Sequence, residues 1–118
     1  MKIRIKGNSL RYRLTKSDMY RLSKEGYLED KTDFGGSALI YVIQKTKDAK
    51  MSAFFNDNVI CLQIPETMIE ELENTDKVGF EGSEENLQLL VEKDFTCLDN
   101  VAEDQSDNYP NPLAEKLK

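Results

Sequence analysis

Two segments near the start of the chain alternate between cationic and apolar side chains, and this pattern constrains the fold most. Residues 2–6 read Lys-Ile-Arg-Ile-Lys, and residues 10–14 read Leu-Arg-Tyr-Arg-Leu. A period of two is typical of a β-strand that buries one face and exposes the other. Gly7-Asn8-Ser9 between the segments consists of turn-forming residues. The chain therefore begins with two half-buried strands that carry their cations on an exposed face.

Two short helices are predicted from their end signals. Thr15 is the expected N-cap of a helix over 16–25, with Asp18 completing a capping box and Gly26 as a left-handed C-cap. Pro65 lies where a second helix begins, at a position where its missing N–H costs nothing. The buried stripe of this second helix is expected to consist of Met68, Ile69 and Leu72.

The remaining apolar segments predict further strands. Leu28 and Phe34 are the expected apolar anchors of a strand over 27–34, and the near-continuous apolar segment 38–43 predicts a central strand covered on both sides. Asn56-Asp57-Asn58 predicts a tight hairpin turn. Further strands are expected over 51–55, 59–64, 78–81 and 87–95.

These elements occur in the order ββα, four strands, then αββ. The order predicts an α+β fold with two short helices on a mainly antiparallel sheet of about seven to eight strands, with a partial barrel as the alternative. We recognise no internal repeat in the sequence. Residues 1–98 are expected to form a single α+β domain, and residues 99–118 an acidic, Pro-containing C-terminal tail. This tail is either solvated or docked on the domain through Tyr109 and Leu113.

The net charge of −6 over 118 residues is unevenly distributed. Residues 1–50 hold twelve Lys/Arg and six Asp/Glu, whereas residues 51–118 hold four and sixteen. Such asymmetry is typical either of two halves that neutralise each other or of a basic binding region followed by an acidic tail. The overall acidity disfavours non-specific binding to nucleic acid.

Several classes of function are excluded by composition. The chain has no His, so it has no imidazole base and no His metal ligand. It has no apolar segment long enough for a membrane helix and no signal-peptide core at its start, and we expect a cytoplasmic protein. Cys61 is expected to be a buried thiol and Cys97 a structural one. We expect no cofactor and assign no catalytic or metal-ligating residue.

The two basic strands pose an electrostatic question. If they form a hairpin with Ile5 opposite Tyr12, then Lys6 faces Arg11 and Arg4 faces Arg13. Like charges directly opposite each other destabilise a sheet, so acidic side chains or a bound anion must compensate them unless the strands are not neighbours. The acidic candidates are Glu92, Asp94 and Glu81.

These considerations give the leading functional hypothesis, a non-enzymatic binding or interaction module. Its contact residues are Arg4, Lys6, Arg11 and Arg13. Arginines bind carboxylates and phosphates bidentately, so the partner is an acidic protein or a small anionic ligand. A phosphate-handling or hydrolytic enzyme that uses Glu92 and Asp94 with Mg²⁺ is one alternative, and nucleic-acid binding is another. No residue pattern specifies the oligomeric state.

The two ends of the chain carry a resemblance. Residues 2–15 read Lys-Ile-Arg-Ile-Lys-Gly-Asn-Ser-Leu-Arg-Tyr-Arg-Leu-Thr, residues 92–98 read Glu-Lys-Asp-Phe-Thr-Cys-Leu, and Asn111-Pro112 follows. With these segments the chain resembles a family of small, single-domain bacterial proteins of uncharacterised function. The resemblance implies a free-standing bacterial protein and supplies no activity, ligand or catalytic residue.

Overall fold

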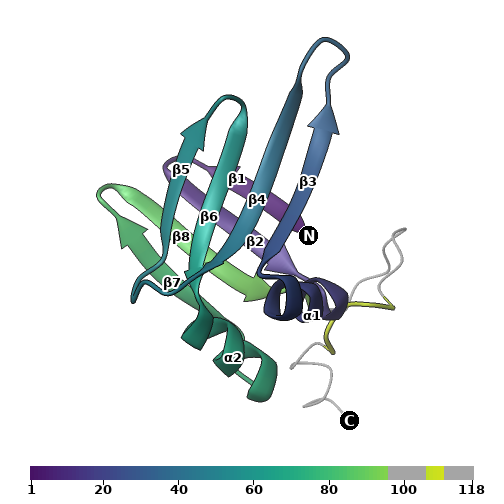
Figure 1. Ribbon diagram of the computed structural model, residues 1–118, viewed down its shortest axis with the longest axis vertical. Helices are drawn as coiled ribbons and strands as arrows, with labels where there is room; N and C mark the ends of the chain where they lie inside the picture. The colour runs from purple at the N-terminus through teal and green to yellow at the C-terminus, as the bar shows by residue number, and fades with distance from the viewer. Residues whose placement is uncertain (96–105, 111–118) are drawn as a thin grey trace.

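The computed structural model describes residues 1–95 and 106–110, and its elements follow the predicted order (Figure 1). Within these residues the chain forms two short helices and eight short strands. In chain order they are β1 (Lys2–Lys6), β2 (Ser9–Leu14), α1 (Lys16–Glu25), β3 (Tyr27–Asp33), β4 (Ala38–Thr46), β5 (Ser52–Asn56), β6 (Val59–Pro65), α2 (Glu66–Asn74), β7 (Gly79–Glu84) and β8 (Leu87–Lys93).

The strands form two four-stranded mixed sheets, which corrects the prediction of one mainly antiparallel sheet or a partial barrel. Sheet A has the order β1-β2-β8-β7, and sheet B has the order β3-β4-β6-β5. Each sheet consists of two antiparallel hairpins joined by a central parallel pair, β2 with β8 or β4 with β6. The hairpins join neighbouring segments, as expected for the one at Asn56-Asp57-Asn58, whereas the parallel pairs join segments far apart in sequence, which no local pattern specifies.

The core lies between the two sheets. Tyr12 and Leu14 from sheet A and Ile43 and Leu62 from sheet B are completely buried there. The Tyr12 hydroxyl donates a hydrogen bond across the core to the Ile60 carbonyl at 3.2 Å. Both helices lie at the end of the sheets away from the hairpin turns (Figure 1). Their buried residues all join this core, and they are Met19, Leu22, Ile69 and Leu72.

The helix-end predictions are confirmed. Thr15 accepts from the Asp18 N–H while the Asp18 carboxylate accepts from the Thr15 N–H, so the capping box is complete. Gly26 has a φ of 77° and ends α1 in the left-handed conformation. Pro65 occupies the N-cap of α2 and makes no side-chain capping bond. The predicted Asn56-Asp57-Asn58 turn is also confirmed, with positive φ at Asp57 and Asn58.

The register of the first hairpin differs from the predicted one by two residues. Arg4 pairs with Arg11, Ile3 with Tyr12 and Lys6 with Ser9. The turn consists of Gly7 and Asn8 alone, and Gly7 takes the positive φ of 55°. A shift by two keeps every side chain on its predicted face, since the side-chain period of a strand is two.

One expectation about sheet B is wrong and another is confirmed in part. Phe34 is not an anchor, because it lies in the β3–β4 turn with 69% of its surface exposed. β4 is central, and its neighbouring residues Val42 and Ile43, which point to opposite faces of the sheet, are both buried. The other residues of β4 are only half-buried, so burial on both faces is limited to the middle of the strand.

The fold has an internal two-fold repeat that the sequence reading missed. β1, β2 and α1 recur fifty residues later as β5, β6 and α2, and each set is followed by a hairpin. The pairing recurs as well, since β2 pairs with β8 in parallel as β6 does with β4. The Gln88 N–H donates to the Asn8 carbonyl, and the Ile40 N–H donates to the Asn58 carbonyl. Two ββαββ units therefore exchange hairpins to build the two sheets.

A described part of the C-terminal region, residues 106–110, contacts the domain. The Tyr109 N–H donates to the Asp94 carbonyl at 2.9 Å, and the Tyr109 ring packs on Phe95 with centroids 6.0 Å apart. The Lys93 ammonium lies 5.1 Å from the Tyr109 ring centroid. The expectations for Cys97, Leu113 and most of 99–118 concern residues outside the described ranges.

Candidate functional site

The outer face of sheet A gathers the cations of β1 and β2. Alternation along each strand turns Ile3 and Tyr12 toward the core, so the basic side chains project from the opposite side. We call this surface the cationic face. It consists of Lys2, Arg4, Lys6, Arg11 and Arg13. The four residues predicted as a contact set therefore lie together on two adjacent strands, and Lys2 is a fifth member that the same alternation marks.

One glutamate partly neutralises this face. Glu92 on β8 lies beside Arg13 in the parallel register, and its Oε1 accepts from Arg13 Nε at 2.8 Å. The same oxygen lies 3.7 Å from Arg11 Nε. Both arginine side chains keep 33–40% of their surface exposed. One carboxylate thus serves two guanidinium groups, and their positive charge is only partly balanced.

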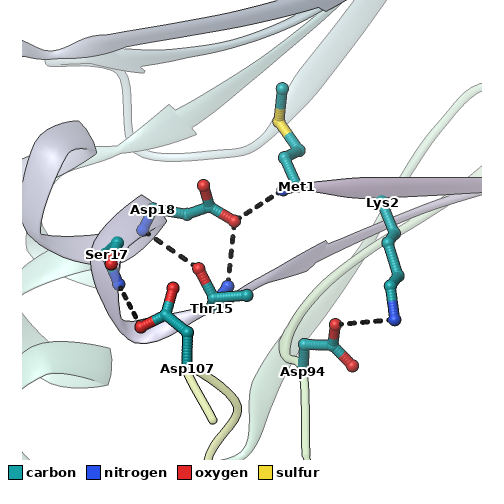
Figure 2. Close-up of polar contacts among 7 residues, drawn as sticks. All are labelled: Met1, Lys2, Thr15, Ser17, Asp18, Asp94 and Asp107. Atoms are coloured by element: carbon teal, nitrogen blue, oxygen red, sulfur yellow. Dashed lines mark hydrogen bonds and ion pairs between the residues drawn. The ribbon is translucent and has the colours of Figure 1, made fainter. Parts of the chain in front are cut away.

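A second acidic group lies at the end of the face near the helix α1 (Figure 2). The Lys2 ammonium is 3.1 Å from Asp94 Oδ2, an ion-pair distance without hydrogen-bond geometry, since that buried oxygen accepts no hydrogen bond in the described structure. Asp18 binds the Met1 ammonium at 2.7 Å, and Asp107 accepts from the Ser17 N–H. These contacts anchor the start of β1 against α1.

Arg4 and Lys6 are the members of the cationic face that no carboxylate of residues 1–95 or 106–110 pairs with. Both are exposed. Arg4 is directly opposite Arg11, so their Cα atoms are roughly 5.5 Å apart in a hydrogen-bonded pair. Two adjacent guanidinium groups, only one of them near a carboxylate, form a local positive excess.

A shallow groove of about 210 Å³ adjoins Arg11. Its lining mixes polar groups with an apolar floor. The residues are Ser9, Leu10, Arg11, Glu81, Gln88, Leu89 and Leu90. The sequence reading did not identify Ser9 and Gln88 as neighbours of the arginines, because their proximity depends on the parallel pairing of β2 with β8.

The internal repeat supplies a comparison within the molecule. The positions on sheet B that correspond to Arg4, Lys6, Arg11 and Arg13 hold Phe54, Asn56, Cys61 and Gln63. Cys61 is a free thiol with only 4% of its surface exposed, and burial raises its pKa. The same backbone arrangement therefore forms without a cation at any of these four positions.

The arrangement has limited metal-binding capacity. Glu92 and Asp94 lie on the side of the sheet that bears the arginines, but each already faces a cation of β1 or β2. No group of three or more His, Cys, Asp or Glu side chains suited to a metal ion occurs in the described ranges.

Neither α1 nor α2, the helices of the described ranges, has the length and apolar character of a membrane-spanning helix.

Comparison with known proteins identifies the family and no closer relative. No curated protein and no solved structure matches the chain. Residues 1–113 match a protein family of unknown function, DUF7009, and the match includes both sheets and both helices. The chain therefore belongs to the DUF7009 family.

Proposed function

We propose that this protein is a non-enzymatic binding module whose cationic face contacts an anionic ligand, and that the ligand is an acidic segment of a partner protein. The observation that carries the proposal is the excess of positive charge on Arg4, Lys6 and Arg11. Neighbouring carboxylates compensate it only in part, although like charges on adjacent strands cost stability.

The internal repeat supports a functional origin for this charge. The fold tolerates Phe54 where β1 has Arg4, and Cys61 where β2 has Arg11. The arginines are therefore not required to build the sheet. The side chains of Arg11 and Arg13 remain 33% and 40% exposed, and their guanidinium groups can donate to a further carboxylate in a bidentate contact.

An acidic protein segment suits the face better than nucleic acid. Aromatic side chains that stack on bases are the usual partners of cations in single-strand binding. The aromatic residue of the basic strands, Tyr12, is completely buried in the core. The overall charge of −6 also disfavours a polyanion as large as a nucleic acid.

The test compares two triple variants of the full chain. Arg4→Gln, Arg11→Gln and Arg13→Gln together remove three charges from the face, and Lys24→Gln, Lys47→Gln and Lys50→Gln remove the same charge from exposed positions elsewhere. The probes are a fluorescent polyglutamate peptide, inorganic pyrophosphate and a single-stranded oligonucleotide, titrated at two salt concentrations.

We expect salt-sensitive binding of polyglutamate that the face variant weakens roughly tenfold or more, since a charged hydrogen bond contributes about 1.5–3 kcal/mol. The control variant should bind within about twofold of the wild type. Equal weakening of binding in both variants would show that net charge, and not the cationic face, determines the affinity. Tighter binding of the oligonucleotide than of the peptide would assign the face to nucleic acid instead.

A further inference from the structure

Among the strands that the structure describes, β1 is the edge strand of sheet A and has a neighbour, β2, on one side only. The two-residue turn makes Lys6 and Ser9 a hydrogen-bonded pair, as in a four-residue β-turn. Hydrogen-bonded and non-hydrogen-bonded pairs alternate along an antiparallel ladder. Lys2, Arg4 and Lys6 therefore direct their backbone groups toward β2, and Ile3 and Ile5 direct theirs toward the open edge.

The equivalent edge strand of sheet B, β5, shows what can bind an outward-directed backbone N–H. Ala53 is the counterpart of Ile3 by the fifty-residue repeat, and its outward N–H donates to the Glu84 carboxylate at 2.7 Å. Glu84 lies on β7, and its counterpart on β3 is Thr32 by the register of the two hairpins. The hydrogen bonds from backbone N–H groups to described carboxylates do not include the N–H of Ile3 or Ile5.

The side chains of β1 determine what kind of strand suits this edge. Its outer face presents Lys2, Arg4 and Lys6 at alternate positions, and its inner face presents Ile5 with 59% of its surface exposed. Opposite charges at facing positions of neighbouring strands stabilise a sheet. An acidic-apolar alternation therefore complements β1 on both faces at once.

A second copy of the same strand is disfavoured. Two β1 edges brought together would set lysine and arginine side chains of both copies on one face, and like charges directly opposite destabilise the pair. The cations of an edge strand commonly prevent such self-pairing. On this strand they also select for an incoming segment of opposite charge.

We propose that the acidic partner adds to sheet A as a further strand beside β1, in an extended segment that alternates Asp or Glu with apolar residues. This inference rests on the proposed function and specifies how the partner is held. Backbone hydrogen bonds to Ile3 and Ile5 supply affinity, while carboxylates on Arg4 and Lys6 supply selectivity.

The first experiment uses the intact protein and two peptides of identical composition. One alternates glutamate with valine, and the other has all its glutamates in one block. We expect the alternating peptide to bind roughly tenfold more tightly, because only its register places every carboxylate on the cationic face. Methylating the peptide amides that face β1 should abolish this preference. Equal affinities of the two peptides would overturn the strand-addition inference.

A second measurement observes the edge directly. Hydrogen exchange at the Ile3 and Ile5 amides should slow at least tenfold when the alternating peptide is bound, and exchange at the Glu29 amide, on the edge strand β3 of sheet B, should not change. Ile5→Pro should lower the affinity for the alternating peptide about tenfold relative to Ile5→Ala. Both substitutions remove the isoleucine side chain, but only proline also removes the backbone N–H.

The two proposals fail differently. If polyglutamate binding depends on the arginines but the Ile3 and Ile5 amides gain no protection, the cationic face binds anions without adding a strand. If no anionic probe binds the wild-type protein, both proposals are wrong.

Discussion

The outer faces of sheets A and B are built on the same backbone pattern and differ in chemistry. Sheet A has Arg4 and Arg11 side by side on its edge hairpin, and sheet B has the exposed Phe54 and the buried Cys61 at the equivalent positions. The sheets share strand order and the pairing of each central strand. The outer residues are therefore not dictated by the fold, and their difference is the basis of the binding role that we propose for sheet A.

The inner faces of the same strands behave in the opposite way. Leu10 and Leu14 on β2 correspond to Ile60 and Ile64 on β6, and all four are buried. Burial of apolar side chains supplies most of the stability of a small domain, so these positions keep one chemical type in both units. The ββαββ unit therefore requires apolar residues on its inner face, whereas the cations on the outer face of sheet A are specific to the first unit.

The largest predicted effect tests the equivalence of the two units in the core. Leu14→Ala and Ile64→Ala each remove a completely buried side chain, which should lower the free energy of unfolding by about 2–5 kcal/mol. Urea denaturation measures both. Losses that differ by more than about 3 kcal/mol would contradict the view that the two positions serve the same packing role.

A smaller effect distinguishes the outer edge strands. Gly79 on β7 corresponds to Tyr27 on β3, and a Cβ at Gly79 would lie 2.6 Å from the Val91 carbonyl oxygen. Gly79→Ala should lower the free energy of unfolding by about 1–3 kcal/mol, because the backbone of β8 must move to admit the methyl group. Tyr27→Ala, at a 42% exposed site, should lower it by less than about 1 kcal/mol. Thermal unfolding compares the two, and a harmless Gly79→Ala would refute the close approach.

Removing the shared carboxylate should sharpen the electrostatic contrast between the sheets. Glu92→Gln leaves Arg11 and Arg13 without their counter-ion and should strengthen polyglutamate binding about 3- to 10-fold. The stability cost should stay below about 1 kcal/mol because the pairs are partly exposed. Glu70→Gln, which removes the same charge at an exposed position of α2, is the matched control and should leave the affinity within about twofold of the wild type. Unchanged affinity in the Glu92 variant would mean that the arginines do not contact the peptide.

The hairpin turns offer a still smaller comparison. Glu85 begins the β7–β8 turn at a φ of 55°, and Gly7 begins the β1–β2 turn at the same φ. Only glycine adopts this region without steric cost, so Glu85→Gly should raise stability by up to about 1 kcal/mol and Gly7→Ala should lower it by a similar amount. Two changes of the same sign would contradict this account of the turns.

The smallest effect concerns the N-termini of the helices. Hydrogen bonds from Thr15 and Ser17 hold the pKa of Asp107 below its ordinary value, whereas the N-terminus of α2 has no side-chain capping bond among the described residues. A depressed pKa contributes stability above the unfolded-state value and loses it as pH falls through the folded-state value. Asp107→Asn should therefore flatten the pH dependence of the unfolding midpoint between about pH 5 and pH 3. An unaltered pH profile would show that the contact does not affect folding.

Local features of the fold were predictable from sequence, and long-range ones were not. The capping box of Thr15 and Asp18 and the Asp57-Asn58 turn depend on residues within one turn of chain. The shared face of the arginines follows from a period of two. The parallel pairs depend on contacts between distant segments. The internal repeat escaped detection because the outer positions diverge and only the burial pattern recurs, as with Tyr12 and Leu62.

The most direct test of the central claim is a titration of the ¹⁵N-labelled full chain with the alternating glutamate–valine peptide, followed by amide chemical shifts. The claim is that the cationic face and edge of sheet A bind an acidic segment and that the equivalent surface of sheet B does not. We predict saturable shift changes on β1 and β2, including Ile3, Ile5 and Arg11, with Cys61 and Gln63, the sheet B counterparts of Arg11 and Arg13, unaffected. Shift changes centred on Phe54 and Cys61, or spread equally over both sheets, would contradict the account.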